Sequence, residues 1–256
     1  MEIIKLHASK KENQVVILLK GFGFANANIL RRYMKDYVPT MAIEDVVFYK
    51  NSSALYDEII AHRLGLIVLK TDLSSYTLKQ ECTCNGEGCA KCTLKITLSA
   101  KGPRMVYAED LVSKDKKVVP VYPKTPLVKL TEGQELECEA TAILGRGYEH
   151  AKWSPGHIYY KAYPQVVMGK NANPDAVVKK YPKVFTLSGK TLKIADPLLV
   201  SEAVEEFCSE HDITISHDSD DIIMVIESFG QLSHKEMLSQ AIQQFTEQVK
   251  ALQEAL

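Results

Sequence analysis

The spacing of apolar and polar residues in the N-terminal part of the chain predicts a close succession of strands and helices. Residues 1–22 alternate loosely, as in a β-hairpin. Over residues 24–37 the apolar side chains recur every three or four positions, which is the period of an amphipathic helix, and Pro39 ends that helix. Residues 41–49 follow as a strand, and a second helix covers residues 55–64. One face of the strand would carry Met41, Ile43, Val47 and Tyr49.

Four closely spaced cysteines follow, between two predicted strands. The first strand covers residues 76–81, and strict alternation over residues 94–99 marks the second, so the cysteines would sit at the tip of a β-hairpin. They are Cys82, Cys84, Cys89 and Cys92. Two short-spaced thiol pairs are typical of a structural zinc site, in which four sulfur atoms surround the metal and leave no open position. Two disulfides or four unmetallated thiols remain as alternatives.

A glycine-rich loop, GRGYEHAKWSPG at residues 145–156, follows the cleanly alternating strand 135–144. The loop contains Arg146, His150 and the single tryptophan, Trp153. Glycines with basic side chains can bind phosphate, but this loop lacks the Gly-Lys-Ser/Thr ending of a P-loop. An aromatic side chain beside arginine and histidine is also typical of protein interfaces, and we prefer that interpretation.

The last part of the chain divides into a small unit and a long helix. Residues 164–222 are predicted to hold two short strands, a helix over 197–209 and two further strands that flank an acidic turn. Ser233 and Glu236 then have the spacing of a capping box. The apolar stripe of the terminal helix consists of Leu238, Ile242, Phe245, Val249, Leu252 and Leu256. Such a stripe can be buried within one chain or against a helix of a second chain.

Composition narrows the classes of function. The 256 residues are 46% hydrophobic with a formal net charge of −1, which argues against a chain that binds nucleic acid by itself through a basic surface. The sequence has no secretory signal pattern and no apolar run long enough to span a bilayer. We therefore expect a cytoplasmic protein without membrane contact, whose thiols stay reduced.

Four stretches of the sequence resemble one protein family. They are Asn-Ile-Leu-Arg-Arg at 28–32, Asp-Glu-Ile-Ile-Ala-His-Arg-Leu-Gly at 57–65, the loop at 145–156, and Ser-Phe-Gly-Gln-Leu at 228–232. The chain resembles the RNA polymerase family that contains the archaeal D-type subunit, the third-largest subunit of eukaryotic RNA polymerase II and the bacterial alpha subunit. The resemblance covers nearly the whole chain and is strongest to the archaeal D-type members.

The resemblance implies an α+β fold in which a discontinuous dimerisation domain, residues 1–44 plus 223–256, carries two insertions. Residues 45–163 would form a mostly-β domain with the four-cysteine zinc hairpin, and residues 164–222 a small ferredoxin-like insert. Some family members bind an iron–sulfur cluster in that insert. Because Cys208 is the only cysteine there and a cluster needs several thiolates, we expect one structural zinc per chain and no iron–sulfur cluster.

The resemblance also implies a non-catalytic role. The chain would pair with a small alpha-like subunit of the archaeal L type, hold the two large RNA polymerase subunits, and meet DNA only indirectly through that complex. Nucleotide addition needs carboxylate-bound magnesium, and the sequence has no dense aspartate motif of that kind. The expected interface residues are Ile29, Leu30, Arg31, Arg32, Met34, Arg146, His150, Trp153, Leu238, Ile242, Phe245 and Val249.

Two other classes of function are alternatives. The first is a stand-alone zinc-ribbon protein that binds nucleic acid, and the near-neutral charge argues against it. The second is a zinc-dependent enzyme, and an all-thiolate site without an open coordination position argues against that.

Overall fold

The computed structural model describes residues 2–9 and 11–256, which fall into two compact units. The first unit comprises the segment up to Ala8 together with Val15–Ile29 and Tyr159–Val225. The second comprises Ser9–Gln14, Leu30–Ile158 and Ile226–Leu256. Five α-helices and several sheets make up the described part of the chain. The prediction of a mixed helical and sheet fold is therefore confirmed.

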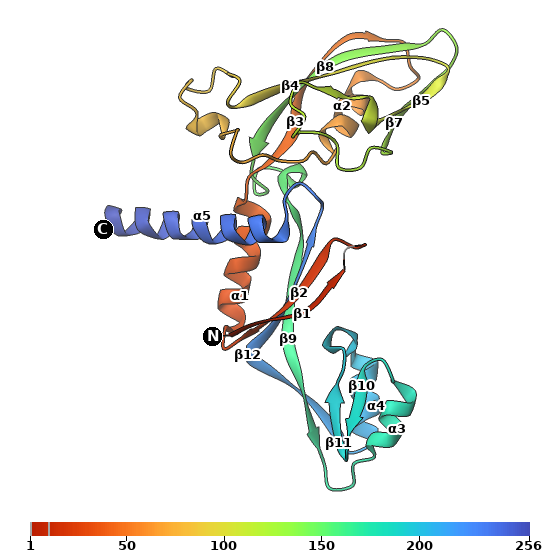
Figure 1. The fold of residues 1–256 in the computed structure, drawn as a ribbon, viewed down its shortest axis with the longest axis vertical. Helices are drawn as coiled ribbons and strands as arrows, with labels where there is room; N and C mark the ends of the chain where they lie inside the picture. Colours follow the sequence, from red (N-terminus) through yellow and green to blue (C-terminus); the bar gives the residue numbers. More distant parts are fainter. Residues whose placement is uncertain (1, 10) are drawn as a thin grey trace. The chain divides into compact units, whose positions relative to one another are not determined.

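The strands of a four-stranded sheet form part of the first unit. Its order is β1 (Glu2–Ser9), β2 (Gln14–Lys20), β12 (Ile213–Ser228) and β9 (Gly156–Met168) (Figure 1). The predicted N-terminal hairpin is present as β1 and β2, although its turn includes Lys10, which lies outside the described residues. Alternate side chains of β2 and β12 form a small core of Val16, Leu18, Ile223 and Val225.

A subdomain lies in this unit between β9 and β12. It contains α3 (Pro174–Lys180), the hairpin of β10 (Phe185–Ser188) and β11 (Thr191–Ile194), the 3-10 turn Pro197–Leu199, and α4 (Glu202–Glu210). Phe185 and Cys208 are fully buried in its core. The predicted pair of short strands and the helix are present, but α3 was not predicted.

The acidic turn predicted within residues 164–222 is wrong. The strand β12 continues for 16 residues through Asp218, Asp220 and Asp221. Gln165 Nε2 donates a hydrogen bond to Asp218 Oδ2 at 3.0 Å, and the Phe22 amide donates to the Asp220 carbonyl oxygen at 2.8 Å. These contacts come from distant parts of the chain. They keep this segment extended, although its local sequence favours a turn.

The second unit is built around a sheet in the order β3 (Thr40–Asn51), β8 (Glu135–Gly145), β4 (Thr93–Lys101) and β6 (Val112–Ser113). The central strand β8 pairs antiparallel with β3 and β4. The helix α2 (Asp57–Gly65) packs against β3, and a strand pair, β5 (Arg104–Tyr107) and β7 (Pro126–Leu130), completes the same core (Figure 1).

The buried face of β3 changes along the strand. Met41 and Ile43 are buried, whereas Val47 and Tyr49 are 51% and 64% exposed. A β-bulge directly after Ile43 places one extra residue in the strand and reverses the alternation of its side chains. The prediction that these four residues share one face is wrong for this reason.

The helix predicted over residues 24–37 is observed as α1 (Gly23–Arg32), which continues as a π-helical turn, Tyr33–Tyr37. The terminal helix α5 (His234–Ala255) packs against that turn within the second unit. It begins with the predicted capping box, in which the Glu236 amide donates to Ser233 Oγ at 3.3 Å and the Ser233 amide donates to Glu236 Oε2 at 2.8 Å. None of the described helices has the length and apolar character needed to cross a membrane.

Candidate metal centre and interaction surface

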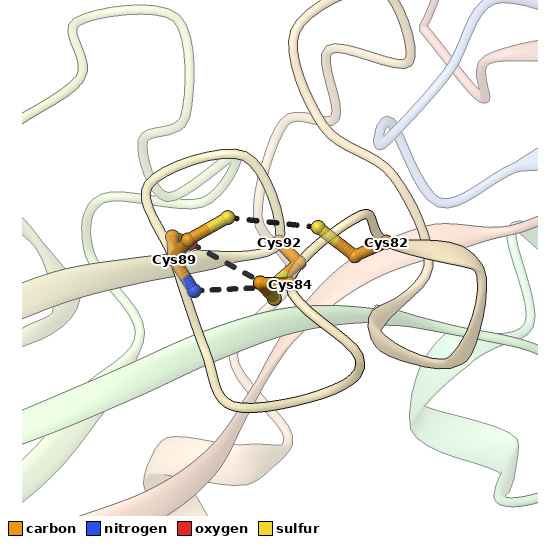
Figure 2. Close-up of side chains that lie close together, drawn as sticks. All are labelled: Cys82, Cys84, Cys89 and Cys92. Atoms are coloured by element: carbon orange, nitrogen blue, oxygen red, sulfur yellow. Dashed lines mark hydrogen bonds between the residues drawn. The ribbon is translucent and has the colours of Figure 1, made fainter.

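The four cysteines converge between a 3-10 turn, Lys79–Glu81, and the start of β4 (Figure 2). Their sulfur atoms all lie within 4.8 Å of one another. Cys82 Sγ is 3.5 Å from Cys89 Sγ, and Cys84 Sγ is 3.6 Å from Cys92 Sγ. The structure thus gathers all four predicted ligands. The strand predicted at 76–81 is wrong, because this segment forms a turn and only β4 follows as a strand.

The sulfur arrangement fits a tetrahedral metal ion. Four thiolates about 2.3 Å from a zinc ion lie roughly 3.8 Å from one another, close to the two distances above. A disulfide needs a sulfur–sulfur distance of about 2.05 Å, so these are free thiols and the disulfide alternative does not apply. Among the described residues, no other group of three or more His, Cys, Asp or Glu side chains is placed to hold a metal.

The loop prepares its sulfur atoms unequally for metal binding. A hydrogen bond from the Gly88 amide is the main cause that lowers the pKa of the Cys84 thiol to about 6. Burial raises the pKa of Cys92 to about 12. The Cys89 amide donates to Cys92 Sγ at 3.3 Å (Figure 2). A divalent cation would displace the remaining protons and neutralise the concentrated thiolate charge.

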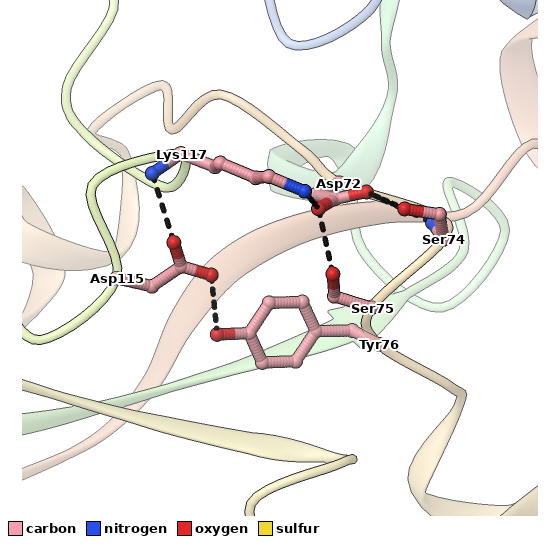
Figure 3. A network of polar contacts seen from close by, with 6 residues as sticks. All are labelled: Asp72, Ser74, Ser75, Tyr76, Asp115 and Lys117. Atoms are coloured by element: carbon pink, nitrogen blue, oxygen red, sulfur yellow. Dashed lines mark hydrogen bonds and ion pairs between the residues drawn. The ribbon is translucent and has the colours of Figure 1, made fainter.

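A polar network fixes the segment that leads into the cysteine loop (Figure 3). Asp72 accepts hydrogen bonds from the Ser74 and Ser75 hydroxyls and pairs with Lys117 at 2.7 Å. The Lys117 hydrogen bond is the main cause that holds the pKa of Asp72 well below its usual range. Tyr76 donates to Asp115 Oδ2 at 2.9 Å, and burial, followed by this bond, raises the pKa of Tyr76 to about 12.

This network was not predicted from the sequence. Its local signal is the Asp-Leu-Ser-Ser run at 72–75, because an aspartate shortly before serines often bonds to the backbone and hydroxyls that follow it. The partners Asp115 and Lys117 lie far along the chain, so only the fold shows the complete arrangement.

The loop at 145–156 is organised around Trp153, which is only 6% exposed. The ring lies so close to Gly145 that a Cβ there would sit 2.4 Å from ring atoms. The Lys152 ammonium is 4.4 Å from the ring centroid, donates to the Ile43 carbonyl oxygen at 3.0 Å and forms an ion pair with Glu44. His150 is exposed, whereas the Arg146 side chain is 18% exposed.

The apolar stripe of α5 lies largely at the surface of the chain. Ile242, Phe245, Val249 and Leu252 are 52%, 40%, 39% and 61% exposed. Only Met237 and Ala241 of this helix are buried, and Leu238 is half-buried. The predicted stripe therefore consists mainly of side chains that the second unit does not cover.

A row of aromatic rings connects the 145–156 loop to α5. The ring centroids of Tyr148 and Tyr37 are 5.5 Å apart, those of Tyr37 and Tyr33 4.6 Å, and those of Tyr33 and Phe245 5.2 Å. The Tyr33 hydroxyl also donates to Gln248 Oε1 at 2.5 Å. This row was not predicted from the sequence. The only local signal is the four-residue spacing of Tyr33 and Tyr37, which places them on one helical face.

The structure separates the predicted interface residues into two groups. Within this chain Met34 is fully buried and Trp153 nearly so. A contact of either residue with a partner stays a prediction. On α1, Ile29 and Arg32 are exposed, while Leu30 and Arg31 are half-buried.

A sequence model of the RNA polymerase Rpb3/RpoA insert domain matches residues 42–158, the segment that holds the sheet β3-β8-β4-β6 and the four cysteines. This segment therefore has the sequence of an insert domain that occurs in RNA polymerase subunits of the Rpb3/RpoA class.

Curated relatives match nearly the whole chain, and each is named DNA-directed RNA polymerase subunit Rpo3. The protein of Archaeoglobus fulgidus is 34% identical in an alignment 238 positions long, which covers 91% of this chain and 90% of the relative. For the protein of Pyrococcus horikoshii the identity is 37%, and the alignment covers 94% of this chain and 93% of the relative. For the protein of Picrophilus torridus the identity is 34%, and the alignment covers 100% of this chain and 99% of the relative. The chain belongs to the family of DNA-directed RNA polymerase subunit Rpo3.

Proposed function

We propose that this chain is a non-catalytic assembly subunit of a DNA-dependent RNA polymerase in the cytoplasm. It binds a small alpha-like subunit as a heterodimer, holds the two large catalytic subunits, and meets DNA only through the complex. The observation that supports this most directly is the exposed apolar stripe of α5, in a chain that belongs to the Rpo3 family. Contiguous apolar surface of this kind typically marks a site for another protein.

The heterodimer contact is formed by α5 together with α1. Ile242, Phe245 and Val249 supply the exposed apolar surface, and the half-buried Leu238 extends it towards the start of the helix. An apolar helical stripe of this length suits pairing with a helix of the partner. From α1, Ile29, Leu30, Arg31 and Arg32 add a mixed apolar and basic surface.

The large subunits contact the region of the cysteine loop and the 145–156 loop. A cavity of 780 Å³ between these loops is lined by, among others, Lys79, Asn85 and His150, with Trp153 as part of its wall. The exposed His150 and Tyr148 offer an aromatic and polar contact of the kind that dominates protein interfaces.

The domain organisation follows from these roles. Residues 1–44 and 223–256 act together as the dimerisation domain, residues 45–163 form the inserted domain with the cysteine site, and residues 164–222 form the second, ferredoxin-like insert. The match of the Rpb3/RpoA insert domain at residues 42–158 supports the limits of the first insertion.

The metal at the four cysteines is a structural zinc ion. The close approach of the sulfur atoms supports this assignment, because soft thiolates in a tetrahedron suit zinc. The second insert carries no iron–sulfur cluster. Its Cys208 is buried in the subdomain core, and burial raises its pKa to about 11, as in an inert core thiol.

Co-expression of the tagged chain with the small alpha-like subunit of its own organism tests the proposal. We expect a stable complex with one copy of each chain by size-exclusion chromatography with light scattering. A homodimer, or a monomer that ignores the small subunit, would contradict the proposed role. Salt-dependent DNA binding by the chain alone would instead favour the stand-alone nucleic-acid-binding protein.

A further inference from the structure

Arg146 connects the cysteine loop with α5. Its Nη2 donates to Glu81 Oε1 at 3.0 Å and to Gln244 Oε1 at 3.2 Å. Glu81 immediately precedes the candidate ligand Cys82, and Gln244 immediately precedes Phe245 of the apolar stripe. One guanidinium therefore contacts both a neighbour of the metal site and a neighbour of the partner-binding surface, and all of these residues belong to the second unit.

The surroundings of Arg146 make it dependent on these acceptors. Its side chain is 18% exposed, and its Nε is buried without a hydrogen-bond partner. Loss of an acceptor from a further buried donor of this side chain would carry the desolvation cost of that donor. Glu81 is the charged partner, whereas Gln244 and Tyr148 are neutral. The Glu81 side chain is 60% exposed, and we expect that loss of its carboxylate releases the guanidinium from Gln244.

Glu81 is the last residue of the 3-10 turn, where its amide donates to the Leu78 carbonyl oxygen at 3.0 Å, and it leads directly into the cysteine loop. The loop is held by short backbone hydrogen bonds, such as those from Asn85 to the Cys82 carbonyl oxygen and from Cys92 to the Cys89 carbonyl oxygen, both at 3.0 Å. A metal bound by four thiolates would fix Cys82 directly, and with it the adjacent carboxylate. Loss of the metal removes this constraint and leaves the loop held by its backbone hydrogen bonds alone.

We propose that metal binding at the four cysteines orders the N-terminal half of α5 through Glu81, Arg146 and Gln244, and so strengthens binding of the partner subunit. Arg146 acts here as a positioning residue. The inference rests on the proposed zinc site and on the proposed partner-binding role of α5. Removal of the metal is expected to weaken partner binding by about tenfold, within the range typical of coupled sites.

Hydrogen–deuterium exchange of the full chain, with zinc and after chelation, tests the coupling without the partner. The variant is Glu81→Ala, and the matched control is Glu87→Ala, because Glu87 is an exposed glutamate of the same loop. In the wild type and the control, chelation should accelerate amide exchange at residues 237–248 by about fivefold or more. In Glu81→Ala, exchange there should be fast with or without zinc. Metal analysis of each protein accompanies the exchange data.

The outcomes separate the two proposals. Zinc binding by the wild type without any effect of chelation on α5 would overturn the coupling and leave the zinc site intact. A Glu81→Ala protein that responds to chelation as the wild type does would also overturn it. Failure of the wild type to bind zinc would contradict the zinc site and the coupling together.

Discussion

A charge placed in the apolar stripe of α5 gives a sharp test of the proposed heterodimer contact. Ile242 is 52% exposed in this chain, so about half of its surface remains to be buried by a partner. Burial of a whole isoleucine side chain is worth roughly 1.5–3 kcal/mol, and the exposed half therefore about 1 kcal/mol. Ile242→Asp loses this burial free energy. It also adds a cost of several kcal/mol to binding, because a carboxylate must be removed from water.

The combined loss is at least about 3 kcal/mol, which corresponds to a more than hundredfold weaker complex at about 1.4 kcal/mol per tenfold. The isolated chain should be nearly unaffected, since substitutions at exposed positions usually change stability by no more than about 0.5 kcal/mol. Calorimetric titration with the small subunit measures the first quantity, and urea unfolding of the chain alone measures the second.

The matched control is Gln243→Asp, which introduces the same side chain one position further along the helix. Each residue turns an α-helix by about 100°, so this exposed position points away from the stripe. The control should bind nearly as tightly as the wild type. Unchanged affinity of Ile242→Asp, or an equal loss in both variants, would show that the stripe is not the contact surface.

Three further predictions concern other parts of the second unit. Replacing Cys89 and Cys92 together by serine should remove one zinc per chain in elemental analysis, and an unchanged metal content would refute the site. Asp72→Asn tests the network of Figure 3. The folded chain holds the pKa of Asp72 below its ordinary value of 3.8, so the ionised carboxylate stabilises the fold at neutral pH. This contribution to stability is lost as the pH falls below about 4. The free energy of unfolding should therefore fall more steeply between about pH 4 and pH 2 in the wild type than in Asp72→Asn, and parallel curves would argue against the network. Gly145→Ala should destabilise the chain by about 1–3 kcal/mol and expose the Trp153 fluorophore, because the added Cβ would lie 2.4 Å from the ring; an unchanged melting temperature and emission spectrum would contradict this packing.

Local patterns predicted the elements whose structure depends on local interactions. The capping box at Ser233 and the apolar period of α5 are both short-range features, and both are observed. The N-terminal hairpin follows in the same way from its alternation. Which side chains of β3 face the core after Ile43 could not be predicted. The bulge that sets this alternation is fixed by pairing with β8, which lies far along the chain.

In the candidate site, too, local features could be predicted from the sequence and long-range ones could not. The local spacing of the four cysteines predicted that they converge. The strand expected before them is a turn in the structure. Periodicity alone also could not tell that Met34 lies inside the chain while Ile29 lies outside, since both fit an amphipathic helix. The row of rings from Tyr148 to Phe245 joins three separate segments, and no sequence pattern indicates which aromatic residues will meet.

Affinity purification of the tagged full chain from its own cells, followed by mass spectrometry of the retained proteins, tests the assembly role most directly. We predict that two large RNA polymerase subunits and a small alpha-like subunit co-purify with the chain. Ile242→Asp should lose the small subunit, and Gln243→Asp should keep it. Recovery of the wild-type chain alone, or only as a homodimer, would contradict the assembly role.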